Sequence, residues 1–263
     1  MTVGTVALGD GELAYEERGS GRPVVFLHAG AMTRAMWDPQ FARFADRYRV
    51  IRYDGRGHGG SARLPQTAFS HHEDTRKLLD ALDIDQAVLV GCSFGSRVFA
   101  DFALAHPDRV GALVLASPGL SGMEFRDPYI LGLEREMASA TSREQVVECL
   151  LRSWVDGPHR SADEVDPAVR EACRSMVWEN IAREHSAPVP AEELRAVDRV
   201  AEIRARTLVL TGELDSSDIV RTAELLDREA PGTRWVRVPG AGHPVNLEQP
   251  DRFGDLLDEF LRG

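Results

Sequence analysis

The chain has few cysteines and no long apolar run. Its three cysteines, at positions 92, 149 and 173, form no C-x-x-C pair and no zinc-ligand spacing, so we expect neither a disulfide framework nor a metal site. No apolar stretch is long enough to span a bilayer, and the first residues show no basic segment followed by an apolar run. These absences predict a soluble, cytoplasmic protein without a membrane partner.

The chain also has fewer basic than acidic residues. Lysine and arginine number 31 against 42 aspartates and glutamates, which gives a formal net charge of -11 at pH 7. This acidic balance argues against a nucleic acid or an anionic membrane as a partner. The glycine-dense segment 54–61 contains neither G-x-x-x-x-G-K-[ST] nor G-x-G-x-x-G, the two common phosphate-binding patterns. We therefore expect no nucleotide cofactor.

What is present is an alternation of short apolar strands and amphipathic helices. Strands are expected near 3–8, 12–17, 24–27, 48–53, 87–90, 110–116, 207–211 and 234–238. The intervening helical patterns predict a mostly parallel sheet of about eight strands covered on both faces. Between 119 and 198 the alternation stops, and helices are expected near 128–140, 142–155, 166–185 and 190–198. The division predicted is a core of 1–118 and 199–263 with an all-helical cap, 119–198.

The segment 87–100 organises the rest of the chain. Four apolar residues lead into Gly91-Cys92-Ser93-Phe94-Gly95, and a helical pattern ending near Ala105 follows directly. A strand that passes into a helix within so few residues needs a sharp turn, and the two glycines relieve its crowding. The serine hydroxyl is then held at the tip of the turn, in front of the N-terminus of the helix.

This G-x-S-x-G turn, between this strand and this helix, resembles the nucleophile elbow of the α/β-hydrolase family. The resemblance implies the chain order serine, acid, histidine, with each residue just after a strand. It identifies Ser93 as the nucleophile, His243 as the base and Asp215 as the carboxylate that orients it. Glu213 and Asp218 remain alternatives for the acid.

The same resemblance implies an oxyanion hole made by two backbone N–H groups. One belongs to Phe94. The other comes from the loop that usually reads His-Gly-x, here His28-Ala29-Gly30, which makes Gly30 the expected donor with Ala29 as an alternative. The segment 54–61 matches the D-x-R-G-x-G-x-S loop of the family, and we expect it to hold the rim of the site.

Residues of the helical segment are harder to assign. Trp154, Trp178 and Tyr129 are candidates for the substrate pocket, although an amphipathic helix needs an apolar face in any case. An acidic substrate would need a guanidinium, and the candidates are Arg126, Arg135 and Arg152. The adjacent histidines at 71 and 72 face different sides of a helix, which is poor geometry for a metal site, and we expect them on the surface.

Serine at position 93 argues against the family members whose nucleophile is aspartate. Segments 102–110 and 243–250 resemble the small capped esterases and enol-lactonases, of which the 3-oxoadipate enol-lactonase type is the nearest. The predicted activity is hydrolysis of a small-molecule carboxylic ester or lactone through an acyl-enzyme, without a cofactor. The alternatives are a perhydrolase or C–C bond hydrolase with the same triad, and a ligand-binding receptor on the same scaffold.

Overall fold

The fold is described from a computed structural model, which defines residues 1–65, 67–181 and 189–263. Eight strands form one sheet in the order β1-β2-β4-β3-β5-β6-β7-β8. Strand β2 runs antiparallel to β1 and β4, and every other pairing is parallel. The strands are β1 (Thr2–Ala7), β2 (Glu12–Arg18), β3 (Pro23–Leu27), β4 (Arg49–Tyr53), β5 (Ala87–Cys92), β6 (Val110–Ala116), β7 (Thr207–Gly212) and β8 (Thr233–Val238). The predicted fold class is confirmed.

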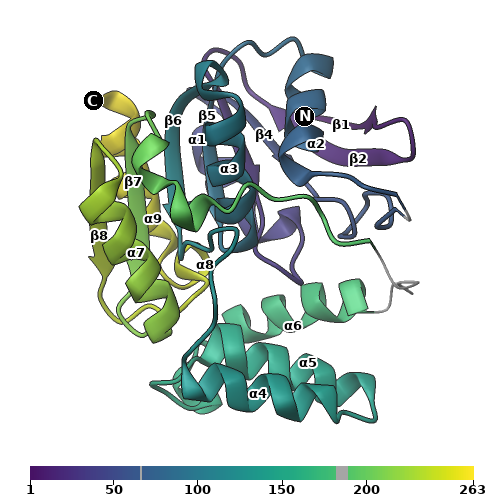
Figure 1. Cartoon of the computed structure of the whole chain (residues 1–263), viewed down its shortest axis with the longest axis vertical. Helices are drawn as coiled ribbons and strands as arrows, with labels where there is room; N and C mark the ends of the chain where they lie inside the picture. The colour runs from purple at the N-terminus through teal and green to yellow at the C-terminus, as the bar shows by residue number, and fades with distance from the viewer. Residues whose placement is uncertain (66, 182–188) are drawn as a thin grey trace.

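Helices cover both faces of this sheet (Figure 1). The α-helices are α1 (Asp38–Phe44), α2 (His71–Ala81), α3 (Phe94–Ala105), α4 (Pro128–Ala138), α5 (Arg143–Leu151), α6 (Pro167–Ile181), α7 (Ser217–Glu229), α8 (Val245–Glu248) and α9 (Pro250–Arg262). Every residue of β5 and β7 is buried, as expected for parallel strands that are covered on both sides.

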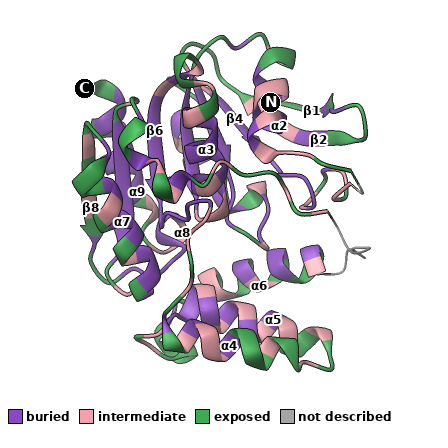
Figure 2. Ribbon diagram, viewed as in Figure 1, coloured by how far each residue is buried: buried purple, intermediate pink, exposed green. Residues whose placement is uncertain are grey.

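Alternate residues of each strand feed two separate cores. Phe26 packs on one face with Trp37 and with Phe253 of α9. The next position, Leu27, belongs to the core on the other face, together with Phe99 of α3. This alternation follows from the pleat of a strand, which points successive side chains to opposite faces. Figure 2 shows the buried residues concentrated along the strands and on the inner sides of the helices.

Between β6 and β7 the chain leaves the sheet. Residues 119–181, which we call the helical insertion, contain α4, α5, α6 and two short elements, η3 (Arg152–Asp156) and η4 (Ala162–Glu164), and no strand. Figure 1 shows these helices as a separate layer at one end of the sheet. Element η3 is a π-helical turn that continues α5 directly. Its Val155 side chain belongs to the core on the Phe26 face of the sheet.

The predicted helix over 190–198 is wrong. The structure has neither helix nor strand from 189 to 195 and only a 3₁₀ turn at Ala196–Asp198, called η5. The backbone N–H of Glu192 donates to the Phe69 carbonyl at 2.7 Å, and that of Leu194 donates to Asp101, so tertiary partners replace helical ones. The end of the helix predicted over 166–185 lies outside the described residues. Among the helices that the structure describes, none is long and apolar enough to cross a membrane.

Candidate active site

Ser93 occupies a strained turn between β5 and α3. Its backbone φ is 53° and ψ is -104°, a conformation that residues with a side chain rarely adopt. The two flanking glycines are required by space: a Cβ at Gly91 would lie 2.3 Å from the Gly95 backbone, and one at Gly95 would lie 2.3 Å from the Leu27 carbonyl oxygen. The sharp turn predicted from the sequence is therefore present, and both glycines are needed for the reason given.

His243 and Asp215 form a buried pair at the ends of β8 and β7. The imidazole Nδ1 lies 3.0 Å and 3.1 Å from the two carboxylate oxygens of Asp215, and both residues are less than 5% exposed. A carboxylate only accepts hydrogen bonds, so Nδ1 carries the proton and donates it. Nε2 is left as an acceptor, the state in which a histidine can take a proton from a hydroxyl.

The end of β6 makes hydrogen bonds both to the Ser93 turn and to the segment 239–244 that carries His243, which we call the histidine loop. The Ser93 N–H donates to the Ala116 carbonyl at 2.9 Å, and the hydroxyl of the next residue, Ser117, donates to the His243 carbonyl at 2.7 Å. All three predicted triad residues thus lie at the carboxyl edge of the sheet, where open α/β sheets build their sites. Within the described chain the Ser93 hydroxyl makes no hydrogen bond, either to His243 or to another residue.

The other two acid candidates are engaged elsewhere. Glu213 accepts from the Gly240 N–H at 3.1 Å on the exposed side of the loop. Asp218 is fully buried and accepts from the backbone N–H groups of Arg126 and Asp127. Of the three carboxylates considered from the sequence, Asp215 is the one that the fold places against the imidazole.

The loop after β3 supplies a candidate oxyanion donor. The Ala29 N–H already points at the Met36 sulfur, 3.0 Å away. Gly30 is exposed, and a Cβ built on it would lie 3.8 Å from the Cβ of Phe94. Neither the Gly30 nor the Phe94 N–H has an acceptor in the described part of the chain. Both N–H groups are therefore free in the described part of the chain and belong to residues that lie side by side, which favours Gly30 over Ala29.

His28 fixes this loop. Its Nδ1 donates to the Ala29 carbonyl at 2.8 Å, and its Nε2 accepts from the Gly55 N–H at 2.9 Å, so the ring is neutral. Complete burial lowers the pKa of His28, which keeps it neutral. The segment 54–61 is attached in the same way: the Asp54 carboxylate accepts from the N–H groups of Arg34 and Gly60. These contacts agree with the rim role expected for that segment.

The expectation that His71 and His72 lie on the surface is wrong. His72 is buried and His71 half-buried, with the His71 ring packed edge-on against Phe94 at 4.9 Å. Burial lowers the pKa of His71 to about 3, so the ring is neutral at physiological pH. The sequence held no signal for this placement, because the N-terminal turn of α2 packs against the serine turn through tertiary contacts alone.

The helical insertion brings one of its predicted residues to the site. The half-buried Trp154 ring lies 4.8 Å from the His243 ring, with Phe125 5.5 Å on its other side. The Tyr129 hydroxyl donates to the Arg152 carbonyl at 3.3 Å, within the insertion. Trp178 is 38% exposed, with the Arg143 guanidinium 3.8 Å from its ring centre, so a pocket role is not supported for it.

The three arginines considered for an acidic substrate also face elsewhere. Arg126 is exposed and paired with Glu124, and Arg152 is paired with Glu136 on the surface of the insertion. Arg135 donates to the Leu131 carbonyl of its own helix. Cys92 is buried, which raises the pKa of its thiol and agrees with a packing role. The described residues contain no cluster of three metal-ligating side chains.

Sequence reasoning missed Asn180, which joins the insertion to the loop after β3 (28–32), called the oxyanion loop below. Its amide nitrogen donates to the carbonyls of Ala31 and Met32 at 2.9 Å and 2.8 Å, and its amide oxygen accepts from the Gly59 N–H. An asparagine near the end of an amphipathic helix carries no motif that could have indicated these contacts.

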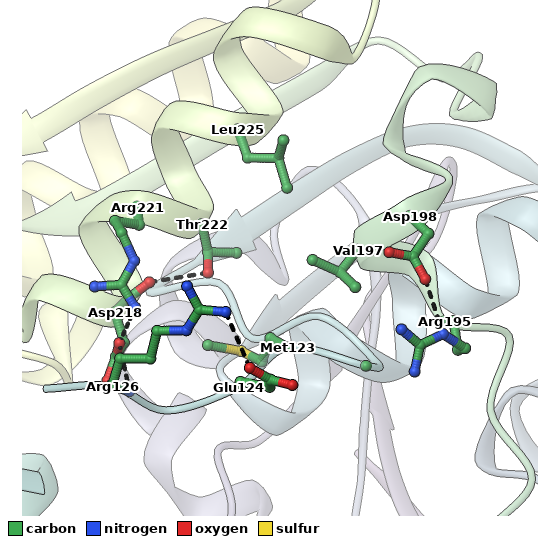
Figure 3. Close-up of a pocket in the computed structure, with 11 residues that line it drawn as sticks. Met123, Glu124, Arg126, Arg195, Val197, Asp198, Asp218, Arg221, Thr222 and Leu225 are labelled. Atoms are coloured by element: carbon green, nitrogen blue, oxygen red, sulfur yellow. Dashed lines mark hydrogen bonds and ion pairs between the residues drawn. The ribbon is translucent and has the colours of Figure 1, made fainter.

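A groove of about 310 Å³ lies apart from this site, between the start of the insertion, η5 and α7 (Figure 3). Its charged side chains are paired with one another: Arg126 with Glu124, Arg195 with Asp198, and Arg221 with Asp218. Val197 and Leu225 contribute apolar surface from opposite sides. With its charges internally compensated, the groove has no unpaired group among the described residues to hold an ionic ligand.

Comparison with known proteins agrees with this fold. The family profile described as alpha/beta hydrolase fold matches residues 22–250. The chain is 30% identical, over all of both sequences, to "Putative carbamate hydrolase RutD" of Caulobacter segnis, and 23% identical to 3-oxoadipate enol-lactonase 1 of Acinetobacter baylyi, over 91% of this chain and 88% of that one. A thermophilic esterase from Thermogutta terrifontis superposes with a TM-score of 0.79 at 27% identity, covering 100% of this chain and 98% of that one.

Proposed function

The chain belongs to the alpha/beta hydrolase family, and from that membership we propose that it hydrolyses a small-molecule carboxylic ester or lactone through an acyl-enzyme. The observation that carries the proposal is the buried His243–Asp215 pair, with Nδ1 3.0 Å from the carboxylate, at the sheet edge that also holds the strained Ser93 turn. The esterase and enol-lactonase among the similar proteins support the substrate class.

In the first half-reaction Ser93 attacks the carbonyl carbon. Its hydroxyl proton moves to Nε2 of His243 as the new C–O bond forms, and Asp215 stabilises the resulting imidazolium. The imidazolium then gives this proton to the departing alkoxide oxygen, which leaves an acyl-enzyme. In the second half-reaction His243 takes a proton from water, the hydroxide attacks the acyl carbon, and Ser93 departs with that proton.

The negative charge that develops on the carbonyl oxygen is stabilised by the backbone N–H groups of Gly30 and Phe94. Such preorganised donors contribute about 3–4 kcal/mol each to transition-state stabilisation. Removal of either is not a simple side-chain change, because both are backbone groups. The position of the Gly30 donor can be tested through His28 and Asn180, whose hydrogen bonds hold the loop after β3.

We assign the cap, 119–198, to substrate recognition, and the core, 1–118 and 199–263, to the chemistry. Trp154 and Phe125 give the histidine side of the site an aromatic wall. The arginines considered for an acidic substrate are engaged elsewhere, which favours a substrate that is uncharged near the scissile bond.

C–C bond hydrolysis with the same triad is the second candidate. It is favoured by 26% identity to a 2-hydroxy-6-oxo-6-phenylhexa-2,4-dienoate hydrolase of Burkholderia cepacia, over 99% of this chain. Cysteine at position 92, where C–C hydrolases of this group often carry asparagine, favours the ester reaction.

The test is a screen of short-chain p-nitrophenyl esters and lactones with wild type, Ser93→Ala and the exposed control Ser139→Ala. We expect turnover with a burst of one p-nitrophenol per chain, a loss of about 10³-fold or more in Ser93→Ala, and no change in the control. A Ser93→Ala variant with wild-type turnover would remove the serine from the reaction. A single burst without recycling would indicate a receptor, and cleavage of a vinylogous diketone alone would indicate C–C hydrolysis.

A further inference from the structure

A buried ion pair joins the helical insertion to the histidine loop. Both guanidinium nitrogens of Arg160 contact the Glu248 carboxylate, Nη1 to Oε2 and Nη2 to Oε1, each at 2.7 Å. The side chains are only 6% and 8% exposed. Arg160 follows η3 in the insertion, whereas Glu248 is the last residue of α8, so the pair links positions that are 88 apart in the chain.

The Glu248 end of the pair is attached next to the catalytic histidine. Its Oε1 accepts from the N–H of Gly242, the residue before His243, at 3.1 Å. A Cβ on Gly242 would lie 2.6 Å from Arg160 Nη2 and 3.0 Å from Glu248 Oε1. The backbone φ of Gly242 is not in the left-handed region, so this glycine is needed for space. The ion pair therefore packs directly on the backbone that carries His243.

The Arg160 end is attached to the turn that carries Trp154. Arg160 Nη2 donates to the Val155 carbonyl at 2.7 Å, and Nε donates to the Asp156 carbonyl at 3.0 Å. These carbonyls lie at the end of the π-helical turn η3, where helices leave acceptors unsatisfied. π-helical turns are frequent at functional sites, and this one presents Trp154 to the His243 ring.

We propose that Arg160 and Glu248 are positioning residues. Their ion pair attaches the helical insertion to the loop that carries His243, and so keeps the Trp154 and His243 rings in their relative positions. The inference rests on the proposed function, since its readout is turnover that depends on His243. Removal of either partner would leave the charge of the other buried without compensation. The backbone of the histidine loop and η3 would then both shift. Because the pair packs on the backbone that carries His243, its loss is expected mainly in the rate constant of the chemical step, with a smaller loss of substrate affinity through Trp154.

The experiment compares Glu248→Gln, Arg160→Gln and the double variant with Glu259→Gln, which breaks the exposed Arg234–Glu259 pair. We expect each single variant to lower kcat by about 10- to 100-fold with KM within about 3-fold, since misplacement of about 1 Å can cost 10²-fold. The double variant is expected to be no slower than the slower single variant. The Glu259→Gln control keeps wild-type kcat and KM.

Arg160→Lys keeps a positive charge but cannot reach both carboxylate oxygens and two carbonyls at once, so it serves if the other variants do not fold. A folded Arg160→Lys with reduced kcat supports the proposal, and one with wild-type kcat overturns it. Folded single variants with kcat within twofold of wild type, or with losses confined to KM, also overturn it. Ser93→Ala separates the two levels: if it keeps full turnover, the proposed function fails rather than the positioning role.

Discussion

The edge of the sheet and the helical insertion contribute to the site in different ways. At the sheet edge, Ser93, Asp215 and His243 each follow a strand closely, and backbone hydrogen bonds to the neighbouring strand ends place them. The insertion reaches the site through side chains from residues far away in the chain, among them Trp154, Arg160 and Asn180. The first arrangement follows from local chain geometry, whereas the second exists only when two distant segments meet.

The insertion is attached to the three loops to which we assign the chemistry. Asn180 holds the oxyanion loop, and Arg160 holds the histidine loop through Glu248. Asp127 accepts from the N–H and the hydroxyl of Ser217 at the start of α7, while Asp218 accepts from the N–H of Asp127 in return. The difference teaches that the proposed reactive groups all lie on the sheet, whereas the insertion contributes contacts that hold the loops around them.

The largest expected effect tests the sheet edge alone. Asp215→Asn can present an amide N–H to Nδ1 and so stabilise the tautomer that carries its proton on Nε2. We expect kcat to fall by about 10⁴-fold with the fold intact. Glu213→Gln, two residues earlier and exposed, is the matched control and should stay within about twofold. Equal losses in both variants, measured with the same ester, would contradict the assignment of the acid.

The next effect is on stability and concerns the rim loop on the core side. Arg56 and Asp74 form a bidentate pair with two contacts of 2.9 Å, and their side chains are 1% and 3% exposed. Arg56→Met leaves a buried carboxylate unpaired, so we expect the free energy of unfolding to fall by about 3–5 kcal/mol.

Urea denaturation measures this loss. Arg76→Met, which removes a half-buried partner of Glu73 and Asp80 on the same helix, should cost below about 1 kcal/mol. If the two variants lose the same free energy of unfolding, the buried Arg56–Asp74 pair does not stabilise the rim loop.

A smaller effect tests the insertion's hold on the oxyanion loop. Asn180→Ala removes both donors to the Ala31 and Met32 carbonyls and the acceptor for the Gly59 N–H. Unsatisfied buried groups cost about 1–3 kcal/mol, and we expect kcat/KM to fall by about 10-fold through a misplaced Gly30. The exposed neighbour provides the control, Glu179→Gln. An Asn180→Ala enzyme as fast as the control would show that the sheet holds this loop without the insertion.

The last effect is a pH dependence of stability on the core side, which disappears near neutral pH. Burial lowers the pKa of His71 from 6.5 to about 3, so the unfolded chain binds this proton first. The stability it contributes is complete above pH 6.5 and is lost as the pH falls toward 3, by at most about 1.4 kcal/mol per pH unit. His71→Leu should flatten thermal stability against pH in this window. A curve as steep as wild type would show that other groups, such as His28 and His72, produce the whole slope.

The sequence by itself determined the order of the strands and helices and the turn around Ser93. Short apolar runs indicate the buried strands, and the glycines at 91 and 95 permit the sharp turn. Both signals depend only on residues that are close together in the chain. It also indicated Asp215 and His243, because parallel strands bring their carboxyl ends to one edge. The buried pair at 3.0 Å agrees with that assignment.

Only the tertiary structure favours Gly30 over Ala29 and Trp154 over Trp178, and only it shows that His71 is half-buried. It alone brought Arg160 to Glu248 and Asn180 to the oxyanion loop. The physical reason is that amphipathic periodicity states which face of a helix is apolar, but not which distant segment covers it. Hydrogen-bond partners separated by 88 or 149 positions depend on how whole layers pack, and no local pattern records that.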